Sequence, residues 1–177
     1  EVIPKIKYGD SYHIDEGVNV SLKLPSDANG NLVVKVYDDN NRRVLEKSEA
    51  VRDGIGTVSI NELKLGMYSL YAYYDGTDYD VEFIDDSFSL GINVNASDLE
   101  IGRENNILIE MPSDATGNIN FTLSDGGNEP LINKTYEING NRIVIPINGL
   151  DSGDYEVEID YAGNYGNYST SRWVYIA

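Results

Sequence analysis

The stretch Leu24-Pro-Ser-Asp-Ala-Asn-Gly-Asn31 returns further along the chain as Met111-Pro-Ser-Asp-Ala-Thr-Gly-Asn118, an offset of 87 residues. Two shorter motifs return at the same offset: Leu63-Lys-Leu-Gly-Met-Tyr68 as Leu150-Asp-Ser-Gly-Asp-Tyr155, and Tyr74-Asp-Gly76 as Tyr161-Ala-Gly163. Because three matched motifs occur in the same order, the sequence indicates an internal duplication. A period of this length fits one small domain per copy rather than a short solenoid repeat.

The duplication predicts two domains, residues 1–91 and 92–177, with almost no linker between them. Within each copy, apolar residues alternate with polar ones, which is the period of a strand with one face on a core. The residues expected to face the two cores are Val18, Val20, Leu22, Leu24, Leu32, Val34, Val36, Val58, Ile60, Tyr68, Leu70, Ala72 and Tyr74 in the first copy, and Ile107, Ile109, Met111, Ile119, Phe121, Leu123, Ile145, Ile147, Tyr155, Val157, Ile159 and Tyr161 in the second.

Turn signals complete the fold prediction. Asp53-Gly54 and Asn139-Gly140 predict β-hairpins, because both residue types tolerate positive φ. The Leu-x-x-Gly-x-Tyr segments resemble the tyrosine corner of immunoglobulin-like domains, in which a Tyr hydroxyl bonds back to nearby backbone. With about seven short strands per copy, we expect an all-β chain of two tandem immunoglobulin-like β-sandwiches. The chain has no Cys, so apolar packing has to join the sheets.

Charge and composition argue against several functions. The chain carries 30 acidic and 13 basic residues, a formal charge of -17, which disfavours nucleic acid and anionic membrane surfaces as partners. No stretch approaches the roughly 20 apolar residues of a membrane helix, so we expect no membrane insertion. His13 is the only histidine and there is no phosphate-binding loop, so the chain is not expected to be an enzyme.

Calcium is the cofactor candidate. Asp75, Asp78 and Asp80 place three carboxylates in one predicted loop, and calcium prefers oxygen ligands from such loops. The second copy has Ala162, Tyr165 and Asn167 at the corresponding positions, so the cluster does not repeat. The alternative is a solvated acidic loop without an ion.

Five sequons of the form Asn-x-Ser/Thr favour a glycosylated, extracellular surface protein. A chain rich in Asn, Ser and Thr also forms such sequons by chance. The candidate glycosylation sites are Asn19, Asn95, Asn120, Asn133 and Asn167.

Tyrosines are the candidates for ligand contact. Tyr71 and Tyr73 alternate with the inward-facing set and should face outward, and Tyr165 and Tyr168 lie in the predicted last loop of the second copy. Exposed aromatic rings stack on sugars and anchor protein interfaces. The alternative is that Tyr simply suits a half-exposed strand.

The repeated motifs, in this order, resemble the tandem bacterial-type Ig-like repeats of adhesin-like surface proteins, as in methanogenic archaea. The resemblance covers nearly the whole chain and is most specific in the Pro-Ser-Asp-Ala-x-Gly and Leu-x-x-Gly-x-Tyr segments. It implies an extracellular, cell-surface location, neighbouring Ig-like repeats in the same chain, and a stalk or spacer role in cell adhesion, and it supplies no catalytic residues. The alternative function is a module that binds a carbohydrate or protein of a partner cell through loops or exposed tyrosines.

Overall fold

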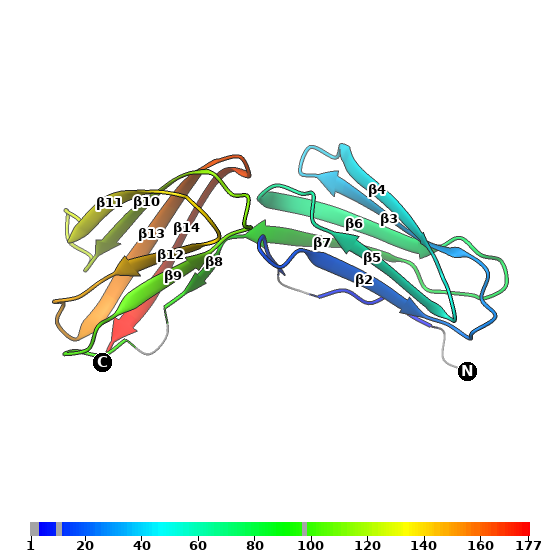
Figure 1. Cartoon of the computed structure of the whole chain (residues 1–177), viewed down its shortest axis with the longest axis horizontal. Coiled ribbons are helices and arrows are strands. Elements are labelled where there is room, and N and C mark those ends of the chain that lie inside the picture. The colour runs from blue at the N-terminus through cyan, green and yellow to red at the C-terminus, as the bar shows by residue number, and fades with distance from the viewer. Residues whose placement is uncertain (1–3, 10–11, 97–98) are drawn as a thin grey trace. The chain divides into compact units, whose positions relative to one another are not determined.

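The computed structural model of the chain describes residues 4–9, 12–96 and 99–177. In this part all regular structure is β-strand (Figure 1), and no described segment forms a helix long and apolar enough to cross a bilayer. The chain divides into two compact units, Glu1–Leu90 and Gly91–Ala177. The sequence predicts this boundary one residue later, after Gly91.

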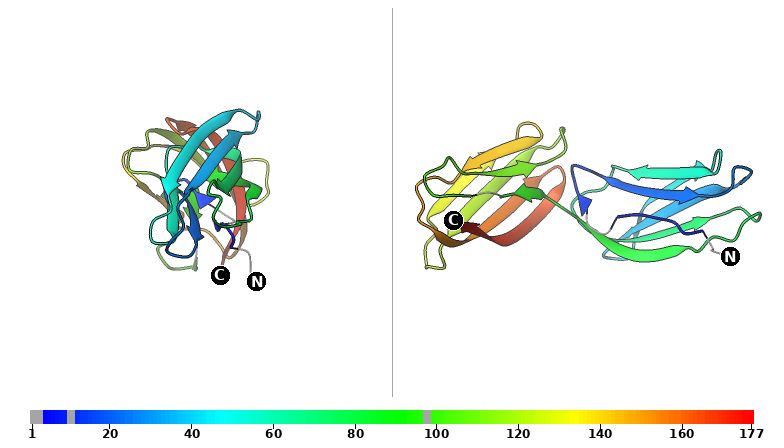
Figure 2. Two further views of the ribbon diagram at one scale, coloured as in Figure 1. Left: turned by 90° about the vertical axis from the view of Figure 1, so that its right-hand side faces the viewer. Right: turned by 90° about the horizontal axis from the view of Figure 1, so that it is seen from below.

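Unit 1 consists of two facing sheets (Figure 2). Its strands are β1 (Tyr12–His13), β2 (Val18–Lys23), β3 (Asn31–Asp38), β4 (Arg43–Ala50), β5 (Ile55–Ile60), β6 (Gly66–Tyr74) and β7 (Ile84–Gly91). Five form one sheet in the order β1-β7-β6-β3-β4, and β2 pairs with β5 in the other. The N-terminal stretch contacts both sheets, since Lys7 bridges to Ser21 of β2 and Lys5 bridges to Glu82, which precedes β7.

Unit 2 also consists of two sheets, but its first strand, β8 (Asn93–Asn95), joins the smaller sheet, whereas β1 joins the larger sheet of unit 1. Its other strands are β9 (Asn106–Glu110), β10 (Gly117–Ser124), β11 (Ile132–Glu137), β12 (Arg142–Pro146), β13 (Gly153–Gly163) and β14 (Gly166–Ile176). One sheet has the order β11-β10-β13-β14 and the other the order β12-β9-β8. The pairing register is conserved between the copies: Leu32 lies opposite Tyr74 in unit 1, and Ile119 lies opposite Tyr161 in unit 2.

The predicted core is confirmed in both units. All the residues expected to face inward are buried except Tyr68, which is half-buried. Phe121, Ile107 and Ile145 are among the fully buried side chains between the sheets of unit 2. Each such aliphatic or aromatic side chain contributes roughly 1.5–3 kcal/mol to folding through removal of apolar surface from water.

The predicted hairpins are wrong, although a tight turn exists at Asp53-Gly54. Asp53 and Gly54 both have positive φ, and Arg52 and Ile55 exchange backbone hydrogen bonds of 2.9 Å around them. The flanking strands β4 and β5 nevertheless belong to opposite sheets, and β11 and β12 around Asn139-Gly140 do the same. A tight turn fixes the local reversal, whereas the apolar pattern of the following strand decides which sheet it joins.

The tyrosine corner is confirmed in both copies. Tyr68 Oη donates to the Lys64 carbonyl oxygen and Tyr155 Oη to the Asp151 carbonyl oxygen, both at 2.7 Å. The glycines before them, Gly66 and Gly153, have φ of 150° and 151°. No neighbouring atom comes closer than 3.8 Å to a Cβ at either position, so the backbone conformation rather than crowding requires glycine.

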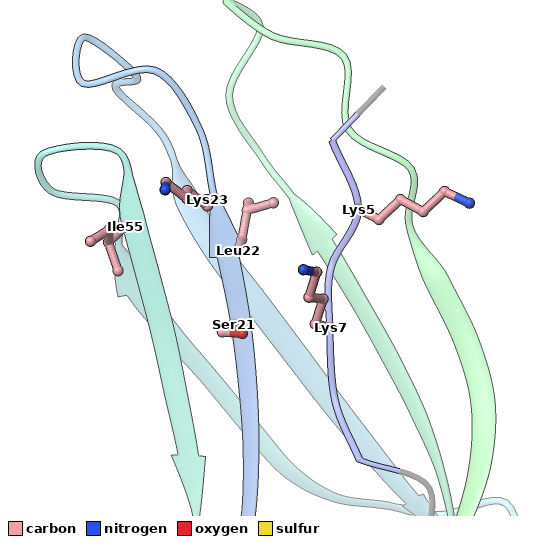
Figure 3. A pocket seen from close by; sticks show the side chains of 6 residues that line it. All are labelled: Lys5, Lys7, Ser21, Leu22, Lys23 and Ile55. Atoms are coloured by element: carbon pink, nitrogen blue, oxygen red, sulfur yellow. The ribbon is translucent and has the colours of Figure 1, made fainter. Parts of the chain in front are cut away.

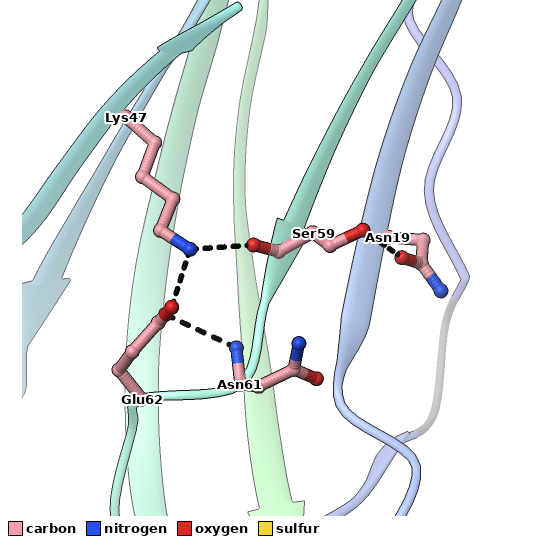
Figure 4. Close-up of polar contacts among 5 residues, drawn as sticks. All are labelled: Asn19, Lys47, Ser59, Asn61 and Glu62. Atoms are coloured by element: carbon pink, nitrogen blue, oxygen red, sulfur yellow. Dashed lines mark hydrogen bonds and ion pairs between the residues drawn. The ribbon is translucent and has the colours of Figure 1, made fainter.

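Charged side chains join the two sheets of each unit where a disulfide is absent. In unit 1, Lys47 of β4 donates to the Ser59 carbonyl oxygen of β5 at 2.8 Å and forms an ion pair with Glu62 (Figure 4). Partial burial is the largest single influence and raises the pKa of Glu62, but the hydrogen bond and charge of Lys47, together with backbone hydrogen bonds, outweigh it and leave this pKa below its usual value. In unit 2, Arg172 of β14 donates to the Val94 carbonyl oxygen of β8 at 2.7 Å.

Candidate functional site

In unit 2, the turn after β13 is hydrogen-bonded to the loop that contains Pro-Ser-Asp-Ala. Tyr161 Oη, at the end of the inward-facing row, donates to the Thr116 carbonyl oxygen at 2.9 Å. Asn164 Oδ1 accepts from the Thr116 N–H at 2.9 Å, and Asn164 Nδ2 donates to the Asp114 carbonyl oxygen at 2.9 Å. Tyr165 Oη donates to the Asp114 carboxylate. We call this contact the loop clasp of unit 2: Asp114, Thr116, Tyr161, Asn164 and Tyr165.

Unit 1 has the same clasp with different side chains. Tyr74 Oη donates to Asp78 Oδ1 at 2.6 Å, and Asp78 Oδ2 accepts from the Asn29 N–H at 2.8 Å. Tyr79 Oη donates to the Asp27 carboxylate, which corresponds to Asp114 of unit 2. The loop clasp of unit 1 is therefore Asp27, Asn29, Tyr74, Asp78 and Tyr79. The offset of 87 aligns Asp78 with Tyr165, but its hydrogen bonds are those that Asn164 makes in unit 2, so one copy uses a carboxylate where the other uses an amide.

The Tyr-x-Gly motif follows from the space that the tyrosine ring fills. A Cβ at Gly76 would lie 2.4 Å from the Tyr74 ring, and a Cβ at Gly163 would lie 1.9 Å from the Thr116 carbonyl oxygen. The glycine of the other motif is restricted in the same way, since a Cβ at Gly30 would lie 2.6 Å from the Tyr74 ring. The two motifs recur together because they are the two sides of one contact.

The calcium candidates have protein partners in this arrangement. Asp78 belongs to the loop clasp, and the Asp75 carboxylate accepts from the Asn31 N–H at 2.6 Å and from Asn31 Nδ2 at 3.1 Å. Asp75, Asp78 and Asp80 do not converge: in the described residues, the group of three whose ligand atoms lie within 4.8 Å of one another is His13, Asp15 and Glu16. Calcium binding by the three aspartates stays a prediction, and it would compete with these hydrogen bonds.

The four candidate tyrosines have different surroundings. Tyr71 and Tyr73 are half-buried on the outer face of the five-stranded sheet, with ring centroids 5.4 Å apart. Tyr165 belongs to the loop clasp, and Tyr168 lies within β14 rather than in a loop. The Tyr168 hydroxyl lies 2.7 Å from where a Cβ on Gly91 would be.

Three exposed aromatic residues of the described part, Phe83, Trp173 and Tyr175, were not among the candidates. Phe83 is 57% exposed, and its ring centroid lies 5.6 Å from that of Tyr71. Trp173 is 58% exposed on β14. Alternation with the buried Val174 and Ile176 is the sequence signal that could have assigned Trp173 to the outer face.

The five sequon asparagines are all accessible. Asn120 is half-exposed, and Asn19, Asn95, Asn133 and Asn167 are exposed. Asn19 and Asn120 accept hydrogen bonds from Ser59 and Thr135 through their amide oxygens. Their amide nitrogens, to which a glycan attaches, take no part in these bonds. Ser97, the third residue of the Asn95 sequon, lies outside the described residues.

A cationic pocket lies beside the N-terminal stretch of unit 1 (Figure 3). It has a volume of about 350 Å³ and is lined by Lys5, Lys7, Ser21, Leu22, Lys23 and Ile55. The Lys5 side chain extends away from β2, in agreement with its 3.5 Å ion pair to Glu82. The sequence analysis did not identify this group, because the N-terminal stretch and β2 are brought together only by the fold.

The loop clasps shift the pKa values of Tyr74, Tyr165 and Asp78. Burial, reinforced by the hydrogen bond to Asp78, raises the pKa of Tyr74 to about 12. Burial and the hydrogen bond to Asp114 likewise raise the pKa of Tyr165 to about 12. The hydrogen bond from Tyr74 lowers the pKa of Asp78 below its usual range. Asp78 therefore stays charged as an acceptor, while Tyr74 and Tyr165 stay protonated as donors.

Comparison with known proteins supports the fold. No family model matches the sequence, and no curated protein is similar to it. The solved ectodomain of the teleost fish polymeric Ig receptor is 13% identical, with a TM-score of 0.50 and coverage of 98% of this chain and 96% of that chain. The fold is thus that of two tandem immunoglobulin-like sandwiches.

Two structures with lower scores are also similar. A biofilm associated protein, BSP domain, is 18% identical with a TM-score of 0.35, and this chain covers 29% of it. A tetra-tandem repeat in the extending region of a large adhesion protein is 15% identical with a TM-score of 0.39, and this chain covers 49% of it. This chain is covered to 98% and 99%, respectively.

The tyrosine pKa shifts predict loss of stability in alkali. The folded-state pKa values of Tyr74 and Tyr165 are about 12, above the ordinary value of 10.0. The unfolded state therefore ionises first, so this stabilisation is complete below pH 10 and is lost as the pH rises toward 12. Urea unfolding should show the free energy of unfolding falling across this pH range. In Tyr165→Phe, the free energy of unfolding of unit 2 should fall less steeply with pH. An unchanged profile in Tyr165→Phe, with the exposed Tyr175→Phe as matched control, would contradict this assignment.

Proposed function

We propose that the chain is a non-enzymatic spacer of an adhesin-like cell-surface protein, which holds a binding region away from the cell envelope. This proposal rests on which residues are alike in the two copies. The shared residues form the cores, the tyrosine corners and the loop clasps, all of which serve folding.

The outer faces of the two copies, in contrast, are not alike. The outward-facing residues of β6 are Met67, Ser69, Tyr71 and Tyr73, and those at the same positions of β13 are Asp154, Glu156, Glu158 and Asp160. A repeat that keeps its interior and varies its surface is what a spacer requires.

The extracellular location is supported by the accessible sequons at Asn19, Asn95, Asn120, Asn133 and Asn167. The resemblance to the Ig-like repeats of archaeal surface proteins supports the same location and neighbouring repeats as partners. The charge of -17 disfavours nucleic acid and adds repulsion between copies that resists clumping.

A spacer has to resist tension along the chain, and pulling on its two ends measures this. We expect two separate unfolding steps in single-molecule force spectroscopy, one for each unit. Each step should release about 300 Å of extended chain, since a residue spans at most roughly 3.5 Å. Each unit should refold on relaxation. A single concerted step, or a unit that offers no resistance, would contradict the proposal.

A second candidate function is recognition by an aromatic strip in unit 1, formed by Tyr71, Tyr73 and Phe83. Their rings are in contact, and Phe83 is 57% exposed. Lys35 lies 5.7 Å from the Tyr73 ring centroid and adds a cation to the strip. Such a surface suits a glycan or a protein of a partner cell.

Binding of a ligand to the aromatic strip should depend on these three rings. On an array of glycans and surface proteins, the triple variant Tyr71→Ser, Tyr73→Ser, Phe83→Ser should lose binding by about tenfold or more. The matched control is Ile55→Ser, which changes an exposed apolar residue outside the strip. Binding that survives the triple variant would exclude the strip.

A further inference from the structure

Trp173 is the only tryptophan of the chain, and its place in unit 2 is unusual for a residue that serves folding. It is 58% exposed on β14, and Tyr175 is 59% exposed two residues later. The buried Val174 and Ile176 alternate with them, so both rings lie on the outer face of the four-stranded sheet. Alternate residues of a strand are about 7 Å apart, which places the two rings side by side along the edge strand.

The fold itself does not use these rings. Within the described residues, neither ring takes part in a hydrogen bond or an aromatic pair. The strand registers align Trp173 with Ser87 and Tyr175 with Ser89 of unit 1, because Gly153 lies opposite Ile176 as Gly66 lies opposite Leu90. The same sandwich is therefore built in unit 1 with serine at both places. A large exposed aromatic residue without a folding role is typical of a contact surface.

Beside Trp173 the outer face has a shallow depression of about 290 Å³ lined by carboxylates and hydroxyls. The lining residues are Glu156, Glu158, Ser169, Thr170 and Ser171. Glu156 lies directly opposite Trp173, and Glu158 lies directly opposite Ser171. The Cβ atoms of residues opposite each other on paired strands are about 5 Å apart, so Glu156 and Trp173 are neighbours on this face.

This combination fits a neutral sugar chain. The C–H face of a sugar ring can pack on an indole or phenol ring, while its hydroxyls donate to carboxylates in charge-assisted hydrogen bonds and exchange hydrogen bonds with serine and threonine. An open depression beside two rings in a row suits successive units of a chain. We propose that the outer face of β13 and β14 in unit 2 binds a neutral oligosaccharide, with Trp173 as the stacking platform and Glu156 and Glu158 as hydroxyl acceptors.

The charge of this face restricts the ligand further. Asp154, Glu156, Glu158 and Asp160 follow one another on the outer side of β13. Their repulsion excludes uronate-rich or sulfated glycans. A bare cationic peptide would match the carboxylates, but it would have no use for the outward-facing hydroxyl side chains of Ser169 and Ser171. The neutral sugar uses both kinds of group.

The test is a titration of the whole chain with cello-, manno- and chito-oligosaccharides, followed through Trp173 fluorescence. We expect a saturable change with at least one of these sugars, at about millimolar affinity, and none with polygalacturonate. By calorimetry, Trp173→Ala should weaken binding about tenfold or more, Trp173→Phe should weaken it less, and Glu156→Gln should weaken it several-fold. Val144→Ala, which shortens an exposed apolar side chain on β12 in the other sheet of unit 2, should leave it unchanged.

The proposal is overturned if none of the neutral sugars binds, if Trp173→Ala binds as well as the wild type, or if oligolysine alone binds. Because Trp173 is exposed, Trp173→Ala should unfold at the wild-type temperature, so that loss of binding reports on the site. The spacer function is independent of this result, since it is judged by the pulling experiment.

Discussion

A tyrosine ring packed on glycine closes one end of each sandwich, and the most specific motifs of the sequence exist to permit this packing. Tyr161 completes the inward-facing row of β13 and hydrogen-bonds to the Thr116 carbonyl oxygen, so the core and the loop are held by one side chain. Gly163 has to be glycine because the Thr116 oxygen occupies the space of its Cβ. In unit 1, Tyr74 and Gly76 meet the same constraint, with Asp78 as the polar partner.

The parts of the fold that depend on local periodicity could be predicted from the sequence. Alternation identifies the buried residues of β2, β3, β6 and their counterparts, because a strand exposes successive side chains to opposite faces. The tyrosine corner could be predicted because its donor and acceptor are four residues apart. The hairpins could not, since Asp53-Gly54 specifies a reversal and not the sheet that the next strand joins. That choice depends on packing between segments far apart in the sequence.

Surface chemistry was harder to predict, because a polar residue in a loop has the same appearance in the sequence whether it binds a ligand or the protein itself. Asp78 was a candidate calcium ligand and Tyr165 a candidate for ligand contact, and the structure gives both of them partners in the loop clasps. The pairing of Trp173 with Glu156 depends on the β13–β14 register, which no single segment specifies. The two copies thus share an interior that a sequence motif can identify, while their outer faces acquire separate properties through strand pairing.

The measurement that tests this account most directly compares the stability of unit 2 in Gly163→Ala with that in Gly127→Ala. Hydrogen exchange of the amides of unit 2 gives this stability. Neither glycine has a positive φ, so backbone strain does not separate them. A Cβ at Gly163 meets backbone at 1.9 Å, whereas a Cβ at Gly127 meets the Asp125 side chain at 3.1 Å. Gly163→Ala should destabilise unit 2 by about 2 kcal/mol or more, and Gly127→Ala by clearly less. Equal stability of the two variants would contradict the claim that the packing of Tyr161 on Gly163 holds this end of the sandwich together.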